Sequence, residues 1–117
     1  MQQLVFEKAW DQTISSQDRQ KITAAFEAIQ TEKNCHLAFL WEATNYKNEK
    51  LVTTLIHNPT EKPLIIQQVA ITFEDDAAVF SLPLEIPSFS SMPWTFIFNE
   101  QNSTTETPDW RIEKNII

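Results

Sequence analysis

The sequence has 117 residues, none of them glycine and one of them cysteine, and its 9 Lys and Arg against 16 Asp and Glu give a formal charge of −7. Phosphate-binding loops and nucleophile elbows need glycine where backbone approaches a ligand or takes a positive φ, so these motifs are excluded. The length and hydrophobic content suit one domain, 1–117, with one core, and a single cysteine cannot form an internal disulfide.

The first predicted element is an amphipathic helix over about 17–30. Apolar residues recur at the spacing i, i+3, i+4 and i+7, namely Ile22, Ala25, Phe26 and Ile29. Ser15 or Ser16 can cap its N-terminus, and Asp18 in the first turn suits the helix dipole. After the helix, Asn34 is the residue best able to adopt left-handed geometry. The apolar stripe predicts packing against another layer.

A β-hairpin is predicted next. Residues 36–43 alternate, and one face is wholly apolar, formed by Leu37, Phe39, Trp41 and Ala43. Residues 51–57 are rich in β-branched side chains and follow the polar turn 45–49, so the two strands are expected to pair. The connection 58–63 contains two prolines, which bound the strands beside them because they donate no ladder hydrogen bond.

Three more strands complete the pattern. Residues 64–73 form one, the acidic turn 74–76 follows, and 77–82 form another before Pro83, with a short edge piece over 84–87. In the last strong strand, 91–99, large apolar side chains share one face, namely Met92, Trp94, Phe96 and Phe98. A polar linker, 100–108, leads to a short C-terminal segment, 109–117, which is expected to return to a sheet edge.

The expected fold is mainly β. Strands within 35–99, separated by turns and with no second helix to build a crossover, predict an antiparallel, immunoglobulin-like β-sandwich. The single N-terminal helix is expected to cover one face of the sandwich or to close an open end.

Candidate chemistry is sparse. Cys35 and His36 are neighbours on a strand, so their side chains point to opposite faces and form no dyad. Together with His57 they lack the close spacing of metal ligands, and the acidic turn 74–76 lacks the alternating ligands of a calcium loop. We therefore expect a protein that is not an enzyme and that uses no metal and no other cofactor.

Aromatic residues offer two interpretations. Alternating aromatics on a strand are usually core, so Trp94, Phe96 and Phe98 are expected to be buried. The alternative is an exposed platform that binds a carbohydrate or a cell-wall polymer. Trp110, which follows the linker, is the aromatic residue expected to be exposed and available to a partner.

Charge indicates the kind of partner. Residues 1–62 hold eight acids and seven bases, whereas 63–117 hold eight acids and two bases, a net of 8 − 7 = one negative charge against 8 − 2 = six. Nucleic acids and anionic membranes need clustered Lys and Arg, so neither is an expected partner. The second half is suited instead to a basic or apolar protein surface. No apolar run reaches the roughly 20 residues of a membrane span, and the N-terminus lacks a signal-peptide pattern, so a cytoplasmic location is expected.

Three segments resemble a known family. They are 51–58 (LVTTLIHN), 62–64 (KPL) and, most specifically, 86–98 (IPSFSSMPWTFIF). The opening, with Trp10, the run 13–15 and the start of the helix at 18–19, resembles it more weakly. The sequence is similar in these stretches to the SLAP domain of accessory Sec system S-layer assembly proteins of Firmicutes, and the similarity covers most of the chain.

The resemblance implies a cytosolic protein that binds rather than catalyses. Its implied partner is an accessory SecA-type motor or a surface-layer precursor, and its implied role is in protein secretion. The motif residues are expected to be structural: Trp41, Met92, Pro93, Trp94, Phe96 and Phe98. An uncovered strand edge would also allow two copies to pair as a homodimer.

Overall fold

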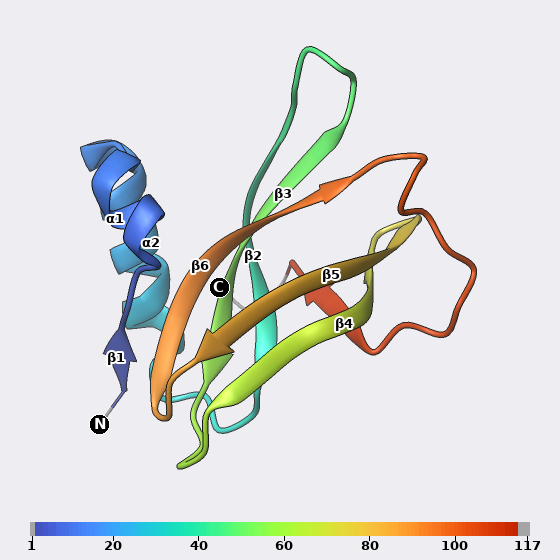
Figure 1. Ribbon diagram of the computed structural model, residues 1–117. Coiled ribbons are helices and arrows are strands. Elements are labelled where there is room, and N and C mark those ends of the chain that lie inside the picture. Colours follow the sequence, from blue (N-terminus) through green and yellow to red (C-terminus); the bar gives the residue numbers. More distant parts are fainter. Residues whose placement is uncertain (1, 115–117) are drawn as a thin grey trace.

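The computed structural model describes residues 2–114, without the side chain of Leu82, so residues 115–117 of the predicted C-terminal segment lie outside it. Figure 1 shows the helices on one side of a strongly curled sheet. The elements in chain order are β1 (Gln3–Leu4), α1 (Lys8–Thr13), α2 (Ser16–Ile29), β2 (His36–Thr44), β3 (Lys50–Asn58), β4 (Leu64–Phe73), β5 (Asp76–Ile86), β6 (Ser90–Phe98) and β7 (Trp110–Glu113).

The strands form one continuous mixed sheet in the order β1-β6-β3-β2-β7-β4-β5. The fold is therefore mainly β, as predicted, but the expected antiparallel, immunoglobulin-like sandwich is not what the strands build. Three pairings are parallel, β1 with β6 and β7 with both β2 and β4. Because β7 bonds to both groups of strands, they curl into a half-barrel and remain one sheet.

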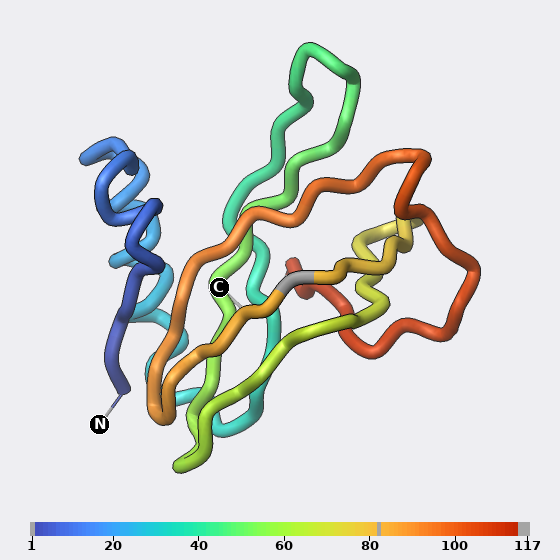
Figure 2. Tube along the Cα trace, viewed as in Figure 1, coloured from blue at the N-terminus to red at the C-terminus, as the bar shows by residue number. Residues whose placement is uncertain are grey.

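The position of β7 corrects the prediction that the C-terminal segment returns to an edge. Leu37 of β2 pairs with Ile112, and Ile71 of β4 pairs with Trp110, so β7 lies inside the sheet. The chain reaches this position around the ends of β4 and β5, as Figure 2 shows in orange to red. The predicted linker is itself anchored, because Ser103 bridges to Ala78 at the free edge of β5.

A β-bulge changes the predicted faces of β2. Phe39 pairs with Thr54 and Trp41 with Thr53, so Leu40 is an extra residue. One extra residue moves every following side chain to the other face. Leu37 and Phe39 pack in the core inside the curl, whereas Trp41 packs under the helices, which corrects the single apolar face predicted for residues 37–43.

A second irregularity lets β5 run through Pro83. The prediction ended this strand at residue 82, with a separate edge piece over 84–87, but β5 is continuous. Its register against β4 shifts between Ile66 and Gln68, where β5 carries one extra residue. Proline is tolerated here because β5 is the last strand of the sheet and is bulged at this point.

Two apolar clusters lie on opposite faces of the sheet. The inner core fills the curl and contains the largest buried side chains, including Phe73 and Phe96. The outer core lies between the sheet and α2. There Ile22, Ala25 and Ile29 of the helix pack on Ala38 and Leu55 of the sheet. Both clusters share the strands β2 and β3, which makes these two strands the common wall of the molecule.

The long predicted helix is confirmed as α2, and the structure selects its cap, since Ser15 Oγ accepts a hydrogen bond from the Asp18 amide at 3.1 Å. The sequence prediction missed α1, a helix of 6 residues capped by the Glu7 carboxylate. It was also wrong about Asn34, because the positive φ angles fall on Asn48, Glu74 and Phe89.

Candidate functional site

A buried polar cluster joins six segments at one end of the sheet. Its centre is Asn58, which is completely buried. The Asn58 Nδ2 donates to the carbonyl oxygens of Lys62, Ile86 and Pro87 at 2.9, 3.1 and 3.0 Å. Its Oδ1 accepts from the amide and the hydroxyl of Thr60 at 3.2 and 2.7 Å. One side chain thus fixes the β3–β4 loop against the β5–β6 turn.

His57 extends the cluster towards the helices. Its Nε2 lies 2.9 Å from the Glu32 carbonyl oxygen, so this nitrogen carries the proton, and its Nδ1 accepts from the Ser91 hydroxyl at 2.8 Å. Burial lowers the pKa of His57, because a charged ring would be poorly solvated there. Gln2 closes the cluster by donating to the Asn58 carbonyl at 3.0 Å.

The segments that carry the family resemblance meet at this cluster. Residues 51–58 end in His57 and Asn58, residues 62–64 supply an acceptor at Lys62, and residues 86–98 supply Ile86 and Ser91. The motif therefore encodes a set of mutual hydrogen bonds that holds three loops together.

The cluster contains a serine–histidine pair that resembles a catalytic dyad in composition. Ser91 and His57 are both completely buried, and the third partner, Glu32, contributes a backbone carbonyl in place of its carboxylate. Neither side chain is exposed to solvent. No group of three metal-ligating side chains comes together within the described part of the chain.

Cys35 and His36 have different partners. Only His36 lies in β2, so they are not the neighbours on a strand that the sequence predicted. The Cys35 thiol donates to Asn58 Oδ1 at 3.8 Å, and burial raises its pKa. The His36 ring lies against His57 with centroids 5.0 Å apart, and its Nδ1 donates to the Asn34 carbonyl. His36 Nε2 is buried and has no hydrogen-bond partner among the described residues.

The predicted motif residues of β6 lie mainly in the inner core. Phe96 and Phe98 are buried and contact Phe80 edge to face, with ring centroids 5.0 and 5.2 Å away. Met92 and Pro93 are also buried. Trp94 is half-buried and stacks on Trp10 of α1 at 6.5 Å, a partner that the sequence pattern could not supply.

The other two predicted tryptophans lie on opposite faces. Trp41 is half-buried in the outer layer, where the Lys21 ammonium lies 5.5 Å from its ring centroid. Trp110 is half-buried and packs against the inner core from β7. The expectation that Trp110 is exposed after a flexible linker is therefore wrong, because the linker is anchored and β7 is an interior strand.

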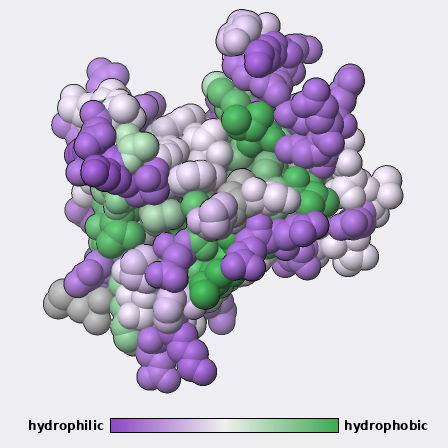
Figure 3. All heavy atoms as spheres, in the orientation of Figure 1, coloured by the Kyte–Doolittle hydropathy of each residue, from purple (hydrophilic) through white to green (hydrophobic). Residues whose placement is uncertain are grey.

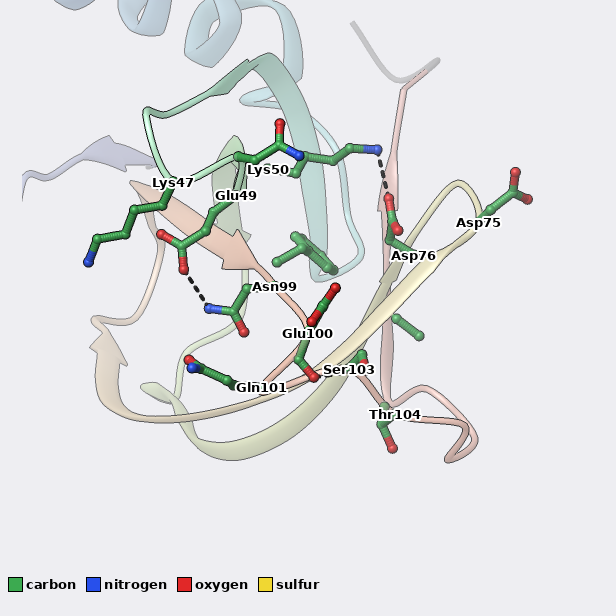
Figure 4. Close-up of a pocket in the computed structure, with 13 residues that line it drawn as sticks. Lys47, Glu49, Lys50, Asp75, Asp76, Asn99, Glu100, Gln101, Ser103 and Thr104 are labelled. Atoms are coloured by element: carbon green, nitrogen blue, oxygen red, sulfur yellow. Dashed lines mark hydrogen bonds and ion pairs between the residues drawn. The ribbon is translucent and has the colours of Figure 1, made fainter.

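A cleft of about 840 Å³ opens at the end of the half-barrel opposite the polar cluster. We call it the mouth cleft. Figure 4 shows that side chains from three regions surround it: the β2–β3 turn with the first residue of β3, the β4–β5 turn, and the loop after β6. Its lining residues are Lys47, Asn48, Glu49, Lys50, Asp75, Asp76, Ala77, Phe98, Asn99, Glu100, Gln101, Ser103 and Thr104.

One ion pair and two hydrogen bonds fix the walls of the mouth cleft. The Lys50 ammonium crosses to the Asp76 carboxylate at 2.6 Å, and this contact raises the pKa of Lys50. The Glu49 carboxylate accepts from the side-chain amides of Asn45 and Asn99 at 2.9 and 2.8 Å. These two hydrogen bonds lower the pKa of Glu49 and keep it ionised.

Sequence reasoning did not predict the mouth cleft. It identified 45–49 and 74–76 as polar turns and 100–108 as a polar linker. Figure 3 shows hydrophilic residues at the tip of the hairpin formed by β2 and β3. The turns come together only because the sheet curls. The signal available in the sequence was the concentration of charged and amide residues in these three connecting segments. That the segments lie at one end of the fold is known only from the structure.

Comparisons with known proteins identify one family. No curated protein and no solved structure matches the chain. No helix within residues 2–114 is both long and apolar enough to cross a bilayer. The family model described as the SLAP domain matches residues 4–115, nearly the whole chain. The chain belongs to the SLAP domain family.

Proposed function

We propose that this protein is a non-enzymatic, cytoplasmic protein-interaction module that assists accessory SecA-dependent export or assembly of surface-layer or cell-wall proteins. The observation that carries the proposal is the family match over residues 4–115. The role itself follows from the association of this domain with S-layer assembly in the accessory Sec system.

The structure supports binding as the mode of action. The serine–histidine pair is sealed inside the polar cluster, whereas the mouth cleft opens to solvent and is built from three turns. Turns held by a rigid scaffold are common positions for binding residues. The carbohydrate alternative rested on Trp94, Phe96, Phe98 and Trp110. Phe96 and Phe98 are buried in the inner core, and the half-buried Trp94 and Trp110 pack against it.

The test is affinity capture from the cytosol of the native organism. The tagged full chain is the bait, and an unrelated tagged domain of similar size and charge is the control. We expect an accessory SecA-type motor or a surface-layer precursor to be enriched on the bait and displaced by untagged protein. Repeated capture without either of these proteins would reject the proposed function.

A further inference from the structure

We propose that the mouth cleft is the docking site for an extended, lysine- or arginine-bearing segment of the partner protein. This inference rests on the proposed function, because it names the part of the protein that contacts the partner.

The shape of the cleft fits a binding site. Ligand sites measure about 300–1,000 Å³ and occur in the mouths of β-barrels, and the cleft has about 840 Å³ at the open end of a half-barrel. Buried Phe98 contributes to its lining, while its walls are polar. A cleft of this size, open to solvent, accommodates several residues of an extended peptide.

Charge favours a cationic occupant. The lining holds four carboxylates and two ammonium groups, a net of 4 − 2 = two negative charges. Lys50 is already paired with Asp76, and Lys47 lies 5.8 Å from the ring centroid of Tyr46. Exposed Asp75 and Glu100 form no ion pair with any residue from 2 to 114, so their carboxylates are available to a partner.

The fixed Glu49 carboxylate strengthens this preference. Its two amide donors hold it in place before any ligand arrives, which lowers the entropic cost of forming an ion pair. The wall formed by the β4–β5 turn and the loop after β6 belongs to residues 63–110, which contain no Lys, Arg or His. The cations at that wall come from other elements and are already paired, Lys50 with Asp76 and Lys114 with Glu74.

The aromatic content of the cleft favours a peptide over a sugar. Phe98 is the aromatic side chain among the lining residues, and it is only 6% exposed. A sugar ring would find no aromatic face to stack on there. Lysine and arginine side chains, by contrast, would meet carboxylates and amides on both walls.

The experiment is a binding titration of the ¹⁵N-labelled full chain followed by NMR. The first probe is a short capped peptide of alternating lysine and serine. Peptides in which glutamine or glutamate replaces lysine are the second and third probes, and a neutral chitin oligosaccharide is the fourth. We expect only the lysine peptide to shift the amide signals of Asn48, Glu100, Gln101 and Ser103.

Matched variants localise the effect. Asp75→Asn with Glu100→Gln removes two charges from the cleft, and Glu61→Gln with Glu85→Gln removes two exposed charges at the other end of the sheet. We expect the first pair to weaken binding of the lysine peptide about fivefold, as the loss of exposed ion pairs predicts, and the second pair to leave it unchanged.

Equal effects of the two pairs, or equal binding of the glutamine or glutamate peptide, would overturn the inference. The inference would also be overturned if the oligosaccharide shifted the same amide signals and the lysine peptide did not. Absence of lysine-peptide binding, with the export motor still captured, would reject the cleft and leave the proposed function standing. Peptide binding without capture of the motor or precursor would reject the proposed function alone.

Discussion

Asn58 shows how one side chain can replace several backbone contacts. It bonds to the carbonyl groups of Lys62 in the β3–β4 loop, Ile86 at the end of β5 and Pro87 in the β5–β6 turn, and it also bonds to Thr60. A sequence without glycine has few residues that turn easily, so side-chain hydrogen bonds must hold its connections. In the segments that resemble the family, buried polar atoms therefore hold the loop and the turn in place.

Replacing Asn58 by alanine is expected to be strongly destabilising. The substitution leaves the Ile86 carbonyl, among others, buried without its donor, and such groups cost about 1–3 kcal/mol each. We expect the free energy of unfolding to fall by about 3 kcal/mol in urea denaturation. The control is Asn34→Ala at an exposed position. Equal losses in the two variants would contradict a central role for Asn58.

His57 makes stability depend on pH. Its folded pKa lies below the ordinary value of about 6.5, so as pH falls the unfolded chain binds the proton first. Stability is therefore highest above pH about 6.5 and declines below it, by at most about 1.4 kcal/mol per pH unit for one proton. Urea denaturation at several pH values measures the slope.

The His57→Gln variant is the control for that slope. Its amide can still donate to the Glu32 carbonyl but does not titrate, so the decline between pH 7 and 5 is expected to flatten. The Glu49 carboxylate, whose pKa is lowered from 4.5, loses its contribution only at more acidic pH. An unchanged slope in the variant would assign the pH dependence to another group.

At the scale of elements, periodicity predicted the strands well and their partners less well. The strand over 64–73 and the hairpin of β2 and β3 are where the alternation placed them. Alternation failed at Leu40, because a bulge leaves no mark in hydrophobicity, and at α1, which is too short to show a helical period. The long-range pairing of β7 depends on the curl of the whole sheet, which local patterns do not encode.

The cap of α2 allows a comparison between neighbouring serines. Ser15 accepts the hydrogen bond from the Asp18 amide, whereas Ser16 is the first residue of the helix. Ser15→Ala is expected to lower the free energy of unfolding by about 1 kcal/mol, and Ser16→Ala by no more than a few tenths, because alanine favours the helix interior. Thermal and urea denaturation of both variants would show the difference. A larger loss at Ser16 would place the cap one residue later.

The interior position of β7 gives another matched pair. Ile112 is 4% exposed in the inner core, and its neighbour Arg111 is exposed. Ile112→Ala is expected to cost about 3 kcal/mol through lost burial and cavity formation, whereas Arg111→Ala stays within about 0.5 kcal/mol. Amide hydrogen exchange should accelerate in both β2 and β4 of the Ile112 variant. Faster exchange in only one of them would contradict a strand that joins both.

At the scale of the molecule, the candidate site was less predictable than the fold. Glu49 is a turn residue in the sequence, and Asp75 and Glu100 belong to turns that follow other strands. The mouth cleft exists because β2 and β3 meet β4 and β5 across β7. The excess of acidic residues in 63–117 over 1–62 was visible in the sequence. The curl of the sheet brings three of these acidic residues, Asp75, Asp76 and Glu100, to the mouth cleft.

The shared wall of β2 and β3 predicts that both cores unfold together. Val52 and Ile56 of β3 pack in the inner core, while Leu55 between them packs under α2, so loss of either layer exposes the other. We expect a single transition in urea, with tryptophan fluorescence and far-ultraviolet circular dichroism giving the same midpoint.

Two reporter variants make that test specific. Because Trp94 stacks on Trp10 of α1, it is replaced in both variants. Trp94→Phe with Trp110→Phe leaves Trp10 and Trp41 at the outer core, and Trp94→Phe with Trp10→Phe and Trp41→Phe leaves Trp110 at the inner core. Within each variant, the fluorescence midpoint is expected to match that from circular dichroism. Both cores pack on β2 and β3, so neither core is expected to stay folded once the other has unfolded. An earlier fluorescence transition for Trp10 and Trp41 would show that the helices detach first, and the sheet would then be the independent folding unit.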